Sequence, residues 1–368
     1  MTPPAIQAGI ARRHNITSKL IARELTRGIE VFCFLITVVF ITGFGLATSA
    51  STTNAQEPSD GQSGAGKQAA LVGQTAEPTT QPAMSAEPVD QEPTSATQPE
   101  AWRPLLDEQL SLWEVFTGVP HRTTKIKGFP PSESHDCRKG TPFGLGDPKN
   151  VFSVTMVDGK PVLHVTGEMY AGLTSLEEFE NYHFSTEFKW GEQKWPPRKE
   201  VKRDSGILIH CIGKHGAFWN AWMRCFQCQV QEGDCGDLIQ LAGTSCQVKV
   251  TPETEDASIP HHSFQGNWRP IGPGVRKWGA KRHGNHEIPG AWNRIDIHTL
   301  SGRTVFSVNG HPVMHLKDTR VGKFKAAKPL TRGKIQVQSE ASECWYRDMK
   351  IRAISKLPPE LATHFDDH

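Results

Sequence analysis

Hydrophobic and polar residues alternate with a period of two over many short segments of this 368-residue chain, from position 152 onwards. In one segment three glutamines, at positions 227, 229 and 231, alternate with small apolar residues. A strand places successive side chains on opposite faces, so this period predicts strands. The predicted strands are 152–157, 162–166, 183–190, 206–211, 226–231, 247–251, 293–299, 304–308, 334–339 and 345–354.

Tight-turn signals separate these strands. Asp158-Gly159, Ser301-Gly302 and Asn309-Gly310 each join two of them, as expected of hairpins. No long segment has the apolar period of a helix, although residues 105–112 and 173–179 are predicted to form one or two helical turns. Residues 252–289, rich in Trp, His, Gly and Pro, are predicted to form a long functional loop or lid. Many short strands without helical crossovers indicate an all-β antiparallel sandwich or jelly roll.

The N-terminal residues carry the pattern of an export signal. A basic segment precedes an apolar run at 31–47, which is followed by small residues and by cleavage sites after Ala50 or Ala55. The run is slightly shorter than a spanning helix needs, and an uncleaved membrane anchor is the alternative. Residues 1–50 therefore predict an exported protein, periplasmic or extracellular, with membrane contact only through an uncleaved N-terminal segment.

Composition divides the rest of the chain. Residues 51–101 are rich in Pro, Thr, Gln and Ala and cannot bury enough apolar surface to offset their ordering entropy, which predicts a disordered linker. Residues 102–357 contain all ten tryptophans and are long enough for one domain with a two-sheet core. Residues 358–368 are assigned to a C-terminal tail.

Charge and cysteines exclude some classes of function. The formal net charge of +2 gives no reason to expect nucleic-acid binding. Seven of the eight cysteines lie in the domain, and an odd number leaves at least one unpaired. Cys225 and Cys228 form a CxxC, but residues three apart in a strand point to opposite faces and cannot bind one metal ion together. The cysteines are predicted to be buried small hydrophobic residues, with room for one or two disulfides.

Three predicted strands carry a polar residue at every second position. Besides the glutamine row at 227–231, these rows are Lys334, Gln336 and Gln338, and Arg294, Asp296 and His298. They are predicted to share one amide-rich and charge-rich sheet face, with an ordinary solvated face as the alternative. Amides bind hydroxyl groups, and aromatic rings cover the apolar faces of pyranoses, so glutamines and tryptophans together favour a saccharide groove. The tryptophans considered are Trp195, Trp219, Trp222 and Trp292.

Longer motifs cover the same region. They are DSGILIHC, WMRCFQCQVQEGDCGD, HEIPGAWNRIDI, VNGHPV and PLTRGKIQVQSEASECWYRDMKIR. In this order they closely resemble the 3-keto-disaccharide hydrolase family, which is abundant in secreted bacterial proteins. The resemblance covers residues 112–354 and implies a concanavalin-A-like jelly-roll sandwich of two antiparallel sheets. It also implies cleavage of glycosides oxidised to a ketone at C3: the ketone acidifies the C2 proton, a base removes it, and the C1 oxygen leaves by elimination.

The resemblance suggests catalytic residues. Those expected are Glu232, His210 and Glu340. Glu232 ends the best-matching motif and is preferred as general base or metal-binding carboxylate, beside turn amides that could stabilise an enolate. For His210 a structural hydrogen bond is the alternative to a site role. Asp204 and Ser205 are expected to fix a turn rather than contact substrate.

Substrate-binding residues are expected on adjacent groove-facing strands and in the flanking loops. They are Gln229, Gln338, Trp219, Trp222, Asp237 and His286. Glu343 with Arg347 is interpreted equally well as a structural ion pair. No cofactor is identified and no metal ligands are assigned, although a divalent metal at the carboxylates around Asp237 stays open.

One position departs from the family pattern. Where the family commonly has a glutamate two residues before the matched Gln229, this chain has Gln227, and an amide cannot act as a general base. The first interpretation is a secreted enzyme that cleaves 3-keto-glycosides or 3-keto-disaccharides, by elimination and hydration or by hydrolysis at C1. The second is a non-catalytic carbohydrate-binding module of the cell envelope. A laminarinase-type hydrolase is disfavoured because such enzymes need glutamates where residues 227–231 offer amides.

Overall fold

The computed structural model describes residues 101–275, 277–322 and 326–365, all of them in a unit that spans Asp90–His368. The expected signal or anchor at 1–50, and all but the last residue of the expected linker at 51–101, lie outside the described residues. Within the described part, no helix is both long and apolar enough to cross a membrane.

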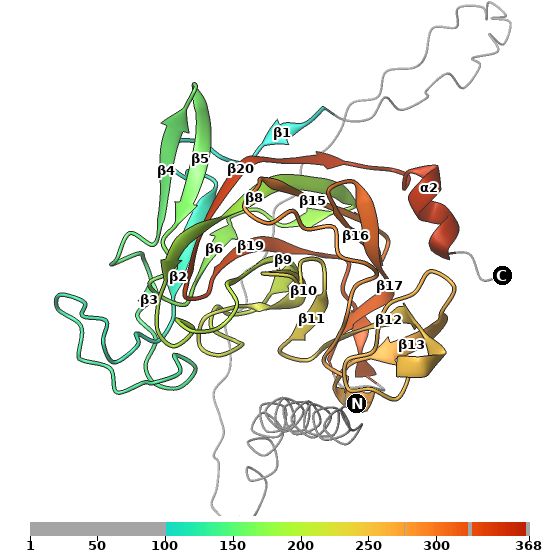
Figure 1. Cartoon of the computed structure of the whole chain (residues 1–368), viewed down its shortest axis with the longest axis horizontal. Helices are drawn as coiled ribbons and strands as arrows, with labels where there is room; N and C mark the ends of the chain where they lie inside the picture. The colour runs from blue at the N-terminus through green and yellow to red at the C-terminus, as the bar shows by residue number, and fades with distance from the viewer. Residues whose placement is uncertain (1–100, 276, 323–325, 366–368) are drawn as a thin grey trace, which may run out of the picture. The chain divides into compact units, whose positions relative to one another are not determined.

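Two antiparallel sheets make up the domain (Figure 1). The larger sheet has the strand order β13-β12-β17-β16-β15-β8-β20-β5-β4, with β1 paired to β20 and β18 paired to β17. Its strands are β1 (Arg103–Pro104), β4 (Phe152–Val157), β5 (Lys160–Val165), β8 (Tyr182–Lys194), β12 (Thr244–Val250), β13 (Asn267–Ile271), β15 (Asn293–Leu300), β16 (Arg303–Val308), β17 (His311–Val321), β18 (Lys328–Pro329) and β20 (Ser342–Ala353).

The smaller sheet has the order β14-β11-β10-β9-β19-β6-β2-β3, with β7 paired to β19. Its strands are β2 (Trp113–Thr117), β3 (Gly144–Leu145), β6 (Ala171–Ser175), β7 (Phe179–Glu180), β9 (Asp204–Ile212), β10 (Arg224–Gln231), β11 (Leu238–Leu241), β14 (Gly279–Ala280) and β19 (Arg332–Ser339). The described helices are short: η1 (Pro252–Thr254), η2 (Pro273–Val275), α2 (Pro359–Ala362) and η4 (Thr363–Phe365). The predicted all-β sandwich of two antiparallel sheets is confirmed.

The predicted strands and hairpin turns are present, but three local predictions are wrong. Residues 173–179 are not helical, because 171–175 form β6, a fully buried strand between β2 and β19. Residues 105–112 contain turns and no helix. The region 252–289 is not one long loop either, because β13 pairs with β12 and β14 pairs with β11 inside it. Pairing with neighbouring strands, which a local pattern does not report, decides the cases of 173–179 and 252–289.

The main core lies between the sheets. From the smaller sheet, Ile207, Phe226, Cys228 and Val230 point into it and are fully buried. They belong to one cluster with side chains of the larger sheet, including Phe184, Phe188, Ile295 and Ile297. Burial of this apolar surface is the main source of stability. The glutamines that alternate with these residues in β10 therefore lie on the outer face of the smaller sheet.

The seven cysteines of the described residues are all buried, and none of them forms a disulfide. Four lie in the main core and three lie in a second cluster on the outer face of the smaller sheet. They pack as small hydrophobic residues, as predicted.

That second cluster forms beneath loops that cover the outer face of the smaller sheet. Leu208 points outward from β9 and is buried there with Tyr170, Trp222 and Met223. Trp222 and Met223 belong to the connection between β9 and β10. The outer face is therefore a covered interior, and polar groups on it are largely removed from solvent.

The polar row of β15 does not lie on this face. β15 belongs to the larger sheet, where Asp296 binds His183 of β8 with 2.9 Å between Oδ1 and Nε2. The prediction that three polar rows share one face is wrong for this row, because the alternation gives the face of a strand but not its sheet.

The last described residues also pack against the domain. Leu361 of α2 and Phe365 of η4 are buried with Val305 and Leu357. The folded domain therefore continues past the expected boundary at residue 357.

Candidate carboxylate site

Two buried carboxyl groups lie side by side on the outer face of the smaller sheet. Asp204 begins β9, and Glu340 directly follows β19. These strands are neighbours, with Val337 opposite Ile207, and three residues further along this register Glu340 lies opposite Asp204. Their exposed fractions are only 3% for Asp204 and 4% for Glu340. Two like charges side by side disfavour ionisation of both groups. The pair therefore has to be treated as one titrating unit.

Arg198 connects the two carboxyl groups. It comes from the loop between β8 and β9 that contains the cis peptide Pro196-Pro197. Its Nη2 lies 2.7 Å from Oδ2 of Asp204, and its Nη1 lies 3.5 Å from Oε1 of Glu340. Burial alone would lower the pKa of Arg198, but the charges of Glu340 and Asp204 outweigh burial and raise it. The site therefore contains a permanent cation.

Two amides of β10 anchor Asp204. Nε2 of Gln231 donates to Oδ2 at 2.5 Å, and Nε2 of Gln229 donates to Oδ1 at 3.0 Å. The period of two in β10 places both amides on the face of Asp204, as the sequence pattern required.

The amide row continues to the next strands. Gln227 donates to Gln229 and, at 3.1 Å, to Oε1 of Gln338 in β19. This bridge passes over Gly206 of β9, where an added Cβ would lie 2.7 Å from amide atoms of both Gln227 and Gln338. The absence of a side chain at Gly206 is therefore what allows β10 and β19 to be linked across β9.

Hydrogen bonding makes the protonation of the two carboxyl groups different. Burial raises the pKa of Asp204 to about 7, and burial together with the negative charge of Asp204 raises the pKa of Glu340 well above its usual range. Asp204 accepts hydrogen bonds from two amides and pairs closely with Arg198, which stabilises its ionised form. The Glu340 side chain, among the described residues, makes only the longer ion pair with Arg198. We therefore assign the shared proton to Glu340 and the negative charge to Asp204.

Tyr170 borders the pair on the side of β6. It directly precedes Ala171, which lies opposite Ser339 in β19, so Tyr170 is level with Glu340. Burial and then the charge of Glu340 raise the pKa of Tyr170 well above its usual range. Its hydroxyl is therefore protonated and able to donate a hydrogen bond next to the carboxyl pair.

Several residues predicted for the site do meet here. Gln229, Gln338 and Glu340 belong to the arrangement just described. Trp222 is buried behind it, with its ring stacked on Tyr170 at 5.4 Å between centroids. Trp219 is 37% exposed and stacks on Phe218, while the guanidinium of Arg138 lies 5.1 Å from its ring centre. Trp222 is therefore a supporting residue, and Trp219 faces the surface.

The structure does not bring the other predicted residues to this group. Glu232 directly follows Gln231, so its side chain does not lie on the face that carries the glutamines. It pairs with Arg203 at 2.9 Å, and 44% of its side chain is exposed. His210 lies at an irregularity of β9, with a φ of 52°, and reaches between the sheets to Oγ1 of Thr299 at 3.2 Å. Burial lowers the pKa of His210 to about 4, so it is a neutral structural histidine.

The last two predicted residues also lie in structural contacts. Asp237 is held by Lys281 at 2.7 Å and by Arg282 at 3.1 Å. His286 stacks on His311 with 4.1 Å between ring centroids. No group of three or more His, Cys, Asp or Glu side chains in the described ranges is arranged to hold a metal ion. The carboxylates around Asp237 are neutralised by basic side chains instead.

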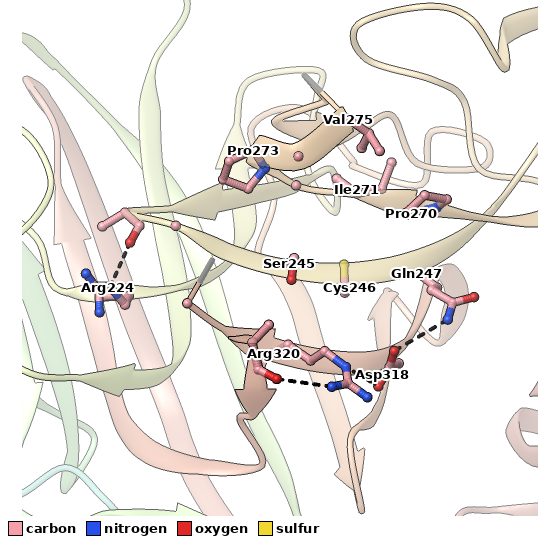
Figure 2. A pocket seen from close by; sticks show the side chains of 16 residues that line it. Arg224, Ser245, Cys246, Gln247, Pro270, Ile271, Pro273, Val275, Asp318 and Arg320 are labelled. Carbon is pink, nitrogen blue, oxygen red and sulfur yellow. Dashed lines mark hydrogen bonds and ion pairs between the residues drawn. The ribbon is translucent and has the colours of Figure 1, made fainter. Parts of the chain in front are cut away.

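A hollow of about 760 Å³ lies away from the carboxyl pair, along β12, β13 and β17 (Figure 2). None of the residues around Asp204 lines it. Arg198 bridges the carboxyl pair in this structure.

Sequence reasoning missed Arg198 and Tyr170 and assigned Asp204 to a turn. For Glu340 a signal was available, because it lies two residues from Gln338, which the sequence pattern places on the polar face. Arg198 comes from a loop, and Tyr170 directly precedes a strand without polar alternation. Only the tertiary structure shows that they lie beside the carboxyl pair.

The amide-lined sheet face with its carboxyl pair lies on a two-sheet β sandwich. The 3-keto-alpha-glucoside-1,2-lyase-like domain family matches residues 101–352. The chain belongs to this family, as its motifs predicted.

Solved structures with related folds are distant in sequence. A glycosyl hydrolase candidate from Parabacteroides distasonis is 17% identical, with 69% of this chain and 100% of that chain covered and a TM-score of 0.37. A protein of unknown function with a galectin-like fold from Bacillus subtilis is 13% identical, with 68% and 94% covered and a TM-score of 0.35. A β-glucanase from Bacillus licheniformis is 9% identical, with 70% and 99% covered and a TM-score of 0.30. No curated protein matches the chain.

Proposed function

We propose that this protein cleaves 3-keto-glycosides or 3-keto-disaccharides at the Asp204–Glu340 pair. The observation that carries the proposal is a buried carboxyl pair bridged by a guanidinium, in which only one member, Asp204, accepts hydrogen bonds from two amides. Elimination next to a ketone needs a base, an acid and a cation that stabilises an enolate. The membership of a 3-keto-alpha-glucoside-1,2-lyase-like family supports this choice of chemistry.

Each group has one role in this reaction. The Asp204 carboxylate removes the proton from C2, and the electron pair of that C–H bond moves to form the enolate of the C3 ketone. Arg198 stabilises the negative charge on the C3 oxygen. The C1–O bond then breaks, a double bond forms between C1 and C2, and Glu340 gives its proton to the departing oxygen. Addition of water at C1 of this enone completes a net hydrolysis.

The neighbouring amides and Tyr170 serve binding in this scheme. Gln229 and Gln231 hold Asp204 from one side. The sugar approaches from the other side, where Arg198 lies. Tyr170 offers a hydroxyl donor beside Glu340. The side chain of Arg198 is 22% exposed, whereas those of Asp204 and Glu340 are 4% and 6% exposed, so a sugar meets Arg198 before it meets the carboxyl groups.

The alternative function is saccharide binding without catalysis. It is favoured by one observation, the amide of Gln227 at the position where the family commonly has a glutamate. The closed carboxyl pair would then be a structural element beneath a sugar-binding surface.

The test is turnover of 3-keto-trehalose, or of a chromogenic 3-keto-glucoside, by the full chain with and without chelator. Glu340→Gln and Asp204→Asn should each lower kcat by about 10²-fold or more, the scale expected for loss of a general acid or base. Glu232→Gln is the matched control, since the same change at an exposed glutamate should leave kcat unchanged. Equal turnover by wild type and by both site variants would contradict the assignment. Saccharide binding without any turnover by wild type would favour the alternative.

A further inference from the structure

The hollow beyond the carboxyl site has two unlike walls (Figure 2). One wall is apolar and comes from β13 and η2, with Pro270, Pro273 and Val275. The floor is β12, which contributes the hydroxyl of Ser245 and the amide of Gln247. The hollow lies where β10 of the smaller sheet meets β12 of the larger one, and its volume of about 760 Å³ suits a small saccharide.

Arginines give the rest of the hollow its charge. Arg224 lies at one end, held by a hydrogen bond of 2.7 Å from Nε to the carbonyl oxygen of Ala242. Arg320 lies on the wall opposite the prolines and pairs with Asp318 at 2.7 Å. Two guanidinium groups and one carboxylate leave the lining with one excess positive charge, at Arg224.

The bonds of these arginines also fix their orientation. The Nε contact of Arg224 leaves both Nη groups to a ligand. Nη1 of Arg320 donates to the carbonyl oxygen of Ala327 at 3.2 Å, so this side chain is held at two points. A preorganised guanidinium binds a carboxylate with little loss of side-chain entropy.

We propose that this hollow is a second ligand site that binds an acidic saccharide, a sugar that carries a carboxylate. The carboxylate binds Arg224, hydroxyl groups bind Gln247 and Ser245, and the apolar face of the ring packs against the proline wall. This site is independent of the Asp204–Glu340 pair, with which it shares no residue.

The experiment compares methyl glucuronide with methyl glucoside, which differ in the carboxylate. Binding to the full chain is measured by titration calorimetry and by saturation-transfer NMR, with inorganic sulfate as a third probe. Methyl glucuronide should bind and methyl glucoside should bind more weakly by about tenfold or more, the effect of losing one charge-assisted hydrogen-bond pair. Arg224→Gln should weaken glucuronide binding by a similar factor.

Two control variants isolate the site. Arg332→Gln makes the same change at an exposed arginine that pairs with Glu178, outside the hollow, and should leave binding unchanged. Glu340→Gln should also leave it unchanged, which separates this proposal from the catalytic one. Equal affinity for the two glycosides, no effect of Arg224→Gln, or equally tight binding of sulfate would each overturn the proposed acidic-saccharide site.

Discussion

Replacing Glu340 by glutamine should make the protein more stable relative to wild type as the pH rises. In the folded protein, burial and the charge of Asp204 raise the pKa of Glu340 well above its ordinary value of 4.5. A carboxyl group with a raised folded pKa binds its proton more tightly in the folded state than in the unfolded state. Its contribution to stability is therefore full below the unfolded pKa and is lost as the pH rises towards the folded pKa.

The neighbouring carboxyl group acts in the same direction. Burial raises the pKa of Asp204 from 3.8 to about 7, so its contribution is also lost between those two pH values. An amide at position 340 does not titrate and removes the like charge beside Asp204. The variant should therefore lack the pH dependence that Glu340 contributes, while burial keeps the part that comes from Asp204.

The expected size follows from proton linkage. One proton released on unfolding changes the free energy of unfolding by at most about 1.4 kcal/mol per pH unit. Between a pH of about 5.5 and about 7.5 the difference between variant and wild type should thus grow by up to about 3 kcal/mol. That is a large part of the roughly 5–15 kcal/mol that stabilises an ordinary domain.

Urea unfolding at a series of pH values, on the full chain, provides the measurement. The difference between two proteins at each pH cancels other titrating groups, such as the buried His262 and His315. Glu232→Gln, at an exposed position, is the control and should give a nearly constant difference from wild type. A difference for Glu340→Gln that is flat, or that falls as the pH rises, would refute the proposed protonation of the pair.

Three further predictions concern the site's cation, its aromatic support and the N-terminal segment. Arg198→Met should lower the free energy of unfolding by about 3–5 kcal/mol, because it leaves two buried carboxyl groups without their cation; Arg203→Met, at the partner of the exposed Glu232, should cost less than about 1 kcal/mol in the same urea assay. Trp222→Ala should cost about 3–5 kcal/mol, because Trp222 is fully buried against Tyr170, and an unchanged midpoint in thermal unfolding would contradict this packing. Mass spectrometry of the native protein should show a chain without the first ~50 residues, and limited proteolysis should cut within 51–101; an intact N-terminus in a membrane fraction would instead indicate an anchor.

The sequence pattern was sufficient for the sheet architecture and for half of the candidate site. Period-two alternation predicted β10 and β19 and the face of their glutamines, because a strand fixes side-chain direction locally. The same pattern could not show that β15 belongs to the other sheet. It also could not show that the irregularity at His210 sends this side chain between the sheets rather than into a groove.

Glu232 illustrates a second limit. Motif strength favoured it, yet its parity opposes that of Gln231, and parity decides which side of the sheet a group occupies. Asp204 had the correct parity and was assigned to a turn, because a carboxylate at the start of a strand has a common structural use. Arg198 carries no local signal, since its position depends on the path of a loop.

The amide at Gln227 does not by itself remove acid–base chemistry from this sheet. Its side chain binds Gln229 and Gln338 and so belongs to the amide row that passes over Gly206. The next row along the strands, level with Gln231, contains Asp204 and Glu340, and Arg198 supplies the cation that keeps one of them ionised. An acid at position 227 would add a third buried carboxyl group, and Arg198 already pairs with two. In this chain an amide at 227 and a carboxyl pair two rows away are therefore mutually consistent, and the proposed acid–base groups are Asp204 and Glu340.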